Sequence, residues 1–200
     1  MTLPDWKAED YFVDFDNIYF SGPIVNAPLE MKTGWIMRYL HEVIFPDAIK
    51  AVVSGGELSG LLLGFSIVDY LAGYFAGKSS QAKDFMAFLN RYFPDQYKPY
   101  AKEIYHHLRS GLIHNLTLQN PWIQSNTPFT IERQSNNHLL TINGKVVFSI
   151  YHFIEDTRRA EIMYLYDLIM KSNENKDLVK NFHRRFNKQD GATSMMAKTD

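Results

Sequence analysis

Apolar residues recur at helical spacing through the first half of the chain. Those between positions 35 and 44 fall three and four residues apart and predict an amphipathic helix, which Pro46 is expected to interrupt. A short helix over 47–53 is expected next. A later apolar stripe over 85–92 predicts another helix, which stops before Pro94. The hydrophobic pattern therefore favours a helical fold from the start.

The segment from 58 to 77 is almost wholly apolar and has nearly the length of a membrane span. A helix that is hydrophobic all round lies either in a membrane or at the centre of a helical protein. Asp69 stands near the middle of the segment, and a carboxylate at the centre of a bilayer is costly. We therefore expect a buried central helix and no membrane association.

A third helical pattern runs from about Lys98 to His114, with Pro99 tolerated in its first turn. Its apolar residues line one face. They are Tyr100, Ala101, Ile104, Tyr105, Leu108 and Leu112.

The pattern changes to that of β-structure after Pro121. The segment 129–133 predicts a strand, and Asn143-Gly144 between two β-rich runs is a strong signal for a hairpin. Two further helices are expected over 153–171 and 176–187. The order predicts a mainly α fold, a helical bundle with a small antiparallel β-hairpin or sheet before the C-terminal helices.

We expect a single domain over residues 1–190. It would begin with an irregular N-terminal arm over 1–27 and carry the β insert at about 128–151, and residues 191–200 would form a flexible tail.

Composition narrows the functional classes. The 200 residues are 46% hydrophobic, which is enough for one domain with a proper core. The absence of cysteine excludes disulfides, thiolate metal sites and cysteine nucleophiles. The acidic start of the chain has no basic n-region, so no secretion signal is predicted and a cytoplasmic location is expected. Since the net charge is -1, any binding to nucleic acid must depend on a local patch.

Arg109 and His114 are the candidate catalytic residues. Arginine is a permanent cation with a forked set of donors that suits phosphate, and histidine transfers protons near neutral pH. On an ideal helix, five positions separate them by about 140°, so they cannot share a site on a continuous helix. Two arrangements would bring such groups together. The helix could end between them, as Gly111 and Asn115 suggest, or a two-fold axis could pair two chains.

The stretch Leu108-Arg109-Ser110-Gly111-Leu112-Ile113-His114 resembles the signature of the HEPN superfamily, in which Arg precedes His by four to six positions. The helix with Ile67-Val68-Asp69-Tyr70-Leu71-Ala72 and the helix over 85–93 extend the resemblance to about residues 30–120.

This resemblance implies a helical domain whose homodimer forms a composite cleft that cleaves RNA without metal or cofactor. Arg109 would stabilise phosphate charge, and His114 would act as acid or base. Ser110 stands where the family often has Asn, Asp or His. Ser110, Asn115, His107 and Asp69 are the candidate supporting or substrate-binding residues. Nothing in the chain points to DNA.

Plainer interpretations accompany each motif. Arg109 could pair with Asp69 or Glu103, and His114 could lie at a helix C-terminus, where a cation gains about 0.3–1 kcal/mol from the dipole. In that case the protein would be a non-catalytic interaction or ligand-binding module.

Two further groups of polar residues have structural interpretations as well. Glu103, His107, Ser110 and His114 share one helical face, which is more typical of an exposed polar face than of a metal site. The basic residues of the last helix form either a solvated face or a local cation patch. They are Lys176, Lys180, Arg184, Arg185 and Lys188.

Overall fold

The computed structural model describes the backbone of residues 26–115 and 128–196, and the side chains of residues 26–112 and 128–188. The predicted arm up to residue 25, and residues 116–127 and 197–200, lie outside the described part. The helical elements are α1 (Leu29–Tyr39), η3 (Leu40–Ile44), α2 (Phe45–Val53), α3 (Glu57–Ala76), α4 (Ala82–Tyr92), η4 (Asp95–Tyr100), α5 (Ala101–Glu103), η5 (Ile104–Arg109), α6 (Ser110–Asn115), α7 (Ile150–Met170) and α8 (Lys176–Met196). The strands are β1 (Phe129–Glu132), β2 (Thr141–Ile142) and β3 (Lys145–Ser149).

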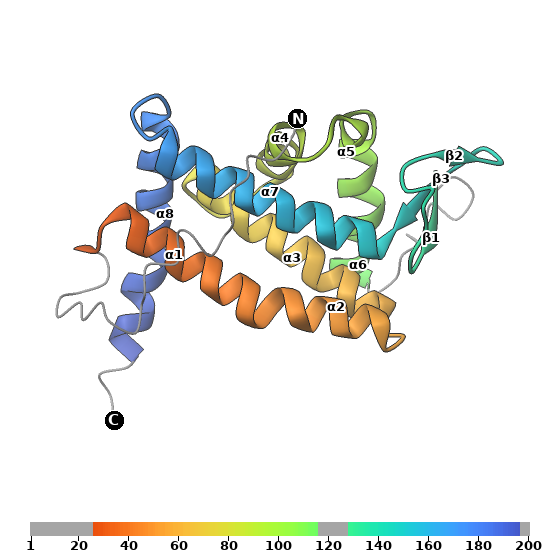
Figure 1. The fold of residues 1–200 in the computed structure, drawn as a ribbon, viewed down its shortest axis with the longest axis horizontal. Coiled ribbons are helices and arrows are strands. Elements are labelled where there is room, and N and C mark those ends of the chain that lie inside the picture. The colour runs from red at the N-terminus through yellow and green to blue at the C-terminus, as the bar shows by residue number, and fades with distance from the viewer. Residues whose placement is uncertain (1–25, 116–127, 197–200) are drawn as a thin grey trace.

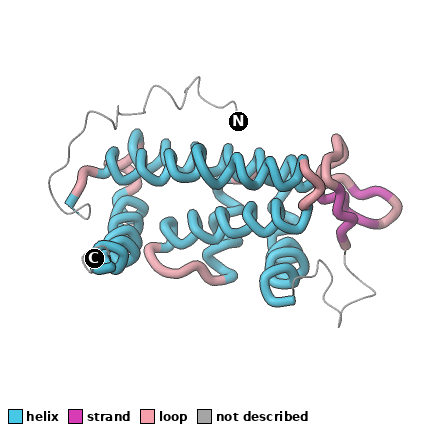
Figure 2. The backbone as a smooth tube through the Cα atoms, turned by 90° about the horizontal axis from the view of Figure 1, so that it is seen from below, coloured by secondary structure: helices cyan, strands magenta, loops and turns pink. Residues whose placement is uncertain are grey.

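The predicted fold class is confirmed, since the chain is mainly helical with a small sheet before its last two helices (Figure 1). The sheet lies at one end of the bundle and α8 at the other, as both ribbon views show (Figures 1 and 2). Helix α3 lies centrally and contacts α2, α4, α7 and α8.

Helices α1, η3 and α2 form one continuous rod, so the predicted interruption at Pro46 is wrong. The π-helical turn η3 comes directly before α2, and Pro46 stands in the first turn of α2. A proline inside a regular α-helix lacks its N–H bond and crowds the carbonyl four residues back. The wider π turn explains how the chain passes Pro46 without a break.

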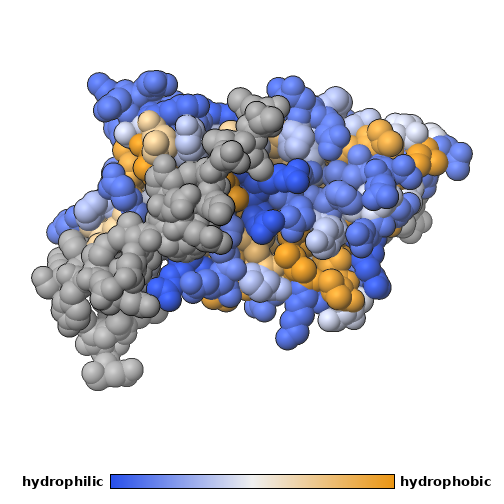
Figure 3. Space-filling model, viewed as in Figure 1, coloured by the Kyte–Doolittle hydropathy of each residue, from blue (hydrophilic) through white to orange (hydrophobic). Residues whose placement is uncertain are grey.

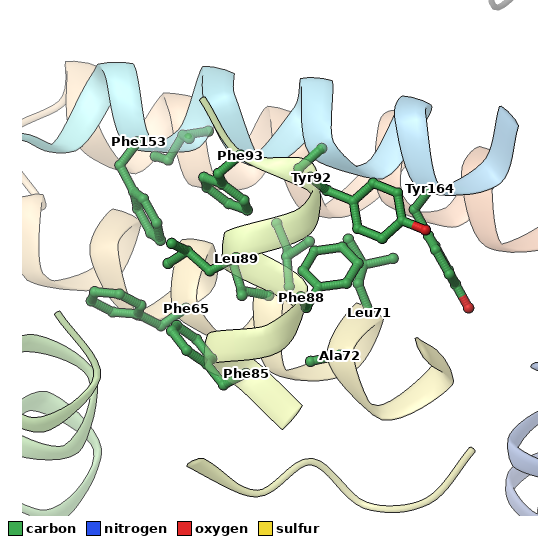
Figure 4. Packing of buried hydrophobic residues seen from close by; sticks show 14 of the residues in the cluster. Phe65, Leu71, Ala72, Phe85, Phe88, Leu89, Tyr92, Phe93, Phe153 and Tyr164 are labelled. Carbon is green, nitrogen blue, oxygen red and sulfur yellow. The ribbon is translucent and has the colours of Figure 1, made fainter. Parts of the chain in front are cut away.

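Half of the residues of α3 are buried, as its apolar composition predicts. It is the one helix in the described part of the chain that is long and apolar enough to cross a membrane. Its core position accounts for this hydropathy. Figure 4 shows Phe65 of α3 among aromatic residues from α4 and α7. Phe65, Phe85, Phe88 and Phe153 are fully buried, and the rings of Phe65 and Phe153 lie 4.7 Å apart.

The predicted hairpin is confirmed, with β2 and β3 antiparallel around Asn143 and Gly144. Both turn residues have positive φ, which Asn and Gly tolerate best. The first strand differs from the expectation of a purely antiparallel sheet, because β1 pairs with β3 in parallel. The sheet is therefore mixed, in the order β1-β3-β2.

A buried polar network ties the sheet to the helices. The Tyr97 hydroxyl donates to Asp156 of α7 at 2.9 Å and lies 2.7 Å from Nε2 of His138. The backbone N–H of Ser149 donates to Nδ1 of His138, so the neutral ring carries its proton on Nε2 and donates it to Tyr97. Burial, together with the nearby His152, lowers the pKa of His138 to about 4.

Helix α8 caps the end of α3. The Arg184 guanidinium donates to the carbonyls of Gly77 and Ala76, which have no partner within α3. The backbone of α8 continues to Met196, beyond the predicted end and into the segment expected to be a tail.

One side of the rod exposes apolar residues. Trp35, Tyr39 and Val43 follow each other at four-residue spacing and are each about half exposed, and Val53 is exposed further along. Figure 3 shows apolar side chains gathered over α2 on this face of the molecule.

Candidate functional site

The segment that carries the candidate residues is not one regular α-helix. It begins as the 3-10 helix η4 and continues through the single turn α5. It then widens into the π turn η5, of which Arg109 is the last residue, before α6 completes it. Because a π turn has i→i+5 hydrogen bonds, the α-helical spacing of side chains does not hold across it. Isolated π turns occur often at functional sites, and this one ends at the candidate arginine.

Arg109 forms an ion pair with Asp69 of α3. Its Nη2 and Nε atoms lie 2.7 and 2.8 Å from Oδ2 of Asp69. The guanidinium also lies over the ring of Tyr105, 5.1 Å from the centroid, in a cation–π contact. Each side chain of the ion pair is 17% exposed. Arg109 is therefore held in position by two neighbours and is mostly buried.

The ion pair itself uses one oxygen of Asp69 and two nitrogens of Arg109. Oδ1 of Asp69 is buried and has no hydrogen-bond partner among the described residues. The two contacts with Asp69 use Nε and Nη2 of Arg109, so neither of them uses Nη1. A phosphate oxygen could therefore approach Nη1 without breaking the contact with Asp69.

His114 and Asn115 lie in α6, and their side chains are outside the described residues. The backbone settles one of the two expected arrangements. Since α6 runs without a break from Ser110 to Asn115, the helix does not end between Arg109 and His114. The arrangement within one chain is wrong, because Gly111 is accommodated inside the helix. Counted along α6, which is α-helical from Ser110 to Asn115, the two positions are about 140° apart.

The remaining candidates lie close by in sequence and are partly buried. Ser110 starts α6 beside Arg109, and Nδ1 of His107 is buried without a partner among the described residues. Glu103 directly precedes η5, and His107 lies within it. No group of three or more His, Asp or Glu side chains suited to a metal ion occurs in the part of the chain with described side chains.

Tyr105 has a role that the apolar stripe does not reveal. As expected of a stripe residue, its ring contacts that of Phe85, with the centroids 5.3 Å apart. Its other neighbour is Arg109, four residues later, and this i, i+4 spacing of an aromatic and a cation was the available signal.

A second buried carboxylate lies away from this site. Glu161 of α7 is fully buried and lies 2.7 Å from Nε2 of His41, which belongs to the other π turn, η3. Burial raises the pKa of Glu161, and the bond from His41 opposes that rise. Each described π turn thus carries a basic side chain that pairs with a carboxylate on another helix.

The comparisons with known proteins identify no relative: no protein-family model, curated protein or solved structure matches the chain.

Proposed function

We propose that this chain is a HEPN-like protein that binds RNA and cleaves it without metal, in a cleft shared by two copies. The position of Arg109 supports the proposal. Its guanidinium is held by Asp69 and Tyr105 while the side chain keeps some exposure to solvent, as suits a preorganised site for a phosphate group.

In this mechanism His114 takes a proton from the 2′-hydroxyl or gives one to the leaving oxygen. Arg109 stabilises the charge that develops on the phosphate. Because the two positions are about 140° apart on one helix, His114 of one copy would act with Arg109 of the other. The continuous backbone of α6 supports a site shared between two copies over a site within a single chain.

The ion pair also supports a second function. A pair that is 17% exposed on each side is typical of a structural contact between two helices. In that case Arg109 joins η5 to α3, and the protein is a non-catalytic module that binds a protein or a small ligand.

Cleavage of RNA in chelator separates the two functions. We would compare the wild type with Arg109→Ala and His114→Ala, and with His106→Ala as a control, since His106 is exposed on the same segment. The first two variants are expected to cleave RNA at least about 100-fold more slowly than the wild type. The control is expected to cleave at the wild-type rate.

Equal cleavage by all four proteins would overturn the nuclease mechanism. No cleavage by a folded wild type, with loss of stability in Arg109→Ala alone, would establish the structural role instead.

A further inference from the structure

Basic residues form a stripe along the exposed face of α8. Lys176, Lys180, Arg184 and Lys188 follow each other at four-residue spacing, and all four are exposed. Residues four apart lie on the same face of a helix, so these cations form one row about 18 Å long. The net charge of the whole chain is -1, so this row concentrates positive charge locally.

Three of these cations are available to a partner. None of the ion pairs between side chains that the structure describes includes Lys176, Lys180 or Lys188. One acid, Asp177, stands in the first turn of the same helix. The positive charge of the row is therefore least neutralised by neighbouring acids from Lys180 to Lys188.

Over the part of α8 whose side chains the structure describes, the opposite face is packed against the core. Leu178, Phe182 and Phe186 are buried, and the rings of Phe182 and Tyr74 of α3 lie 5.2 Å apart. An amphipathic helix that lies on a membrane needs its apolar face free for the lipid. Since this face is already buried against α3, the row is suited to a polyanion in water and not to a lipid surface.

Helix α8 packs on α3, the helix that also carries Asp69. Asp69 and Gly73 lie one turn apart on nearly the same face of α3, about 6 Å along its axis. Nε of Arg185 lies 3.5 Å from the point that a Cβ on Gly73 would occupy. Arg185 of α8 therefore lies against α3 and is not part of the exposed row.

We propose that the basic face of α8 binds the phosphate backbone of single-stranded RNA. The inference rests on the proposed function, to which it adds a docking surface. Successive cations along α8 are about 6 Å apart in rise. That spacing exceeds the roughly 3.4 Å rise per nucleotide of a stacked strand, so it suits an extended single strand.

Equilibrium binding of a fluorescent single-stranded RNA to the full chain tests the proposal. The test variant is Lys180→Gln/Lys188→Gln, which removes two charges and keeps good helix formers. Lys50→Gln/Lys145→Gln is the matched control, because both lysines are exposed on other elements. Each lost phosphate contact lowers the salt slope by about 0.7 for a single strand, so the test variant should lose about 1.4 in slope.

At about 0.1 M salt this corresponds to binding at least tenfold weaker than that of the wild type and the control. Equal affinities and salt slopes for the test and control variants would overturn the proposal. Binding to anionic phosphatidylserine vesicles with none to RNA would overturn it in favour of a membrane partner.

Binding and cleavage measured on the same variants separate this inference from the proposed function. Weaker RNA binding by the α8 variant with no cleavage by any variant supports the docking face and rejects the nuclease. Cleavage that requires Arg109, with RNA binding unchanged in the α8 variant, supports the nuclease and rejects the docking face.

Discussion

At the residue scale, the Asp69–Arg109 ion pair is the most constrained feature of the candidate site. Two nitrogens of Arg109 converge on one carboxylate oxygen, and the ring of Tyr105 covers the guanidinium. The carboxylate lies in the apolar helix α3, where Arg109 supplies its donors. The sequence gives two acids as candidate partners of Arg109, and only the packing of η5 on α3 selects Asp69 over Glu103.

Replacing Asp69 by Asn tests how far this pair supports the fold. Asn keeps the shape but removes the charge, so Arg109 would remain partly buried beside a weaker acceptor. We expect the free energy of unfolding to fall by about 1–3 kcal/mol. Urea titration of Asp69→Asn, Arg109→Ala and the double variant would measure the coupling. Strictly additive effects would contradict a direct interaction.

His138 makes the stability of the fold depend on pH. Its pKa is about 4 in the folded protein against 6.5 for an ordinary histidine, because burial and His152 disfavour the charged ring. The folded state therefore binds fewer protons than the unfolded state between these values. The free energy of unfolding should fall as the pH drops from 6.5 toward 4, by about 3 kcal/mol from this residue.

The measurement compares wild type with His138→Gln by urea titration at pH 7, 5.5 and 4.5. Burial raises the pKa of Asp156 and Glu161, so these two carboxyls act in the opposite direction as the pH falls. The two proteins share both carboxyls, and the difference between their profiles isolates His138. Parallel profiles would refute the role assigned to this ring.

At the element scale, the periodicity of the sequence predicted which segments are helical, and local geometry determined the rest. The buried α3, the hairpin at Asn143-Gly144 and the two last helices follow from local patterns. The π turns η3 and η5 do not, because the apolar spacing across them resembles that of an α-helix. The parallel pairing of β1 with β3 joins segments far apart in sequence, and no local pattern encodes it.

The crossing of α2 and α3 depends on a glycine. A Cβ on Gly60 would collide with Cγ2 of Val52 and lie 3.1 Å from the carbonyl oxygen of Ala48. We expect Gly60→Ala to lower the free energy of unfolding by about 1–3 kcal/mol despite the better helix propensity of alanine. Thermal unfolding would be compared with Ser59→Ala, whose position on α3 is exposed. Adding Val52→Ala to Gly60→Ala should restore part of the lost free energy of unfolding. If it restores none, the contact with Val52 is not the source of the strain.

At the scale of the whole molecule, the proposed cleft requires two chains. On the continuous helix formed by η5 and α6, Arg109 and His114 lie about 140° apart, so one chain presents half of each site. The two-fold pairing therefore predicts that specific cleavage activity falls when the protein is diluted below its dimer dissociation constant.

Sedimentation velocity over the same dilution series gives the fraction of dimer independently, and the two curves should coincide. Exposed Lys50→Gln/Lys145→Gln protein serves as a control for surface charge. A chain that cleaves RNA at constant specific activity while it sediments as a monomer would rule out the shared cleft. Arg109 and His114 would then have to meet within one chain, which would require α6 to unwind after Arg109.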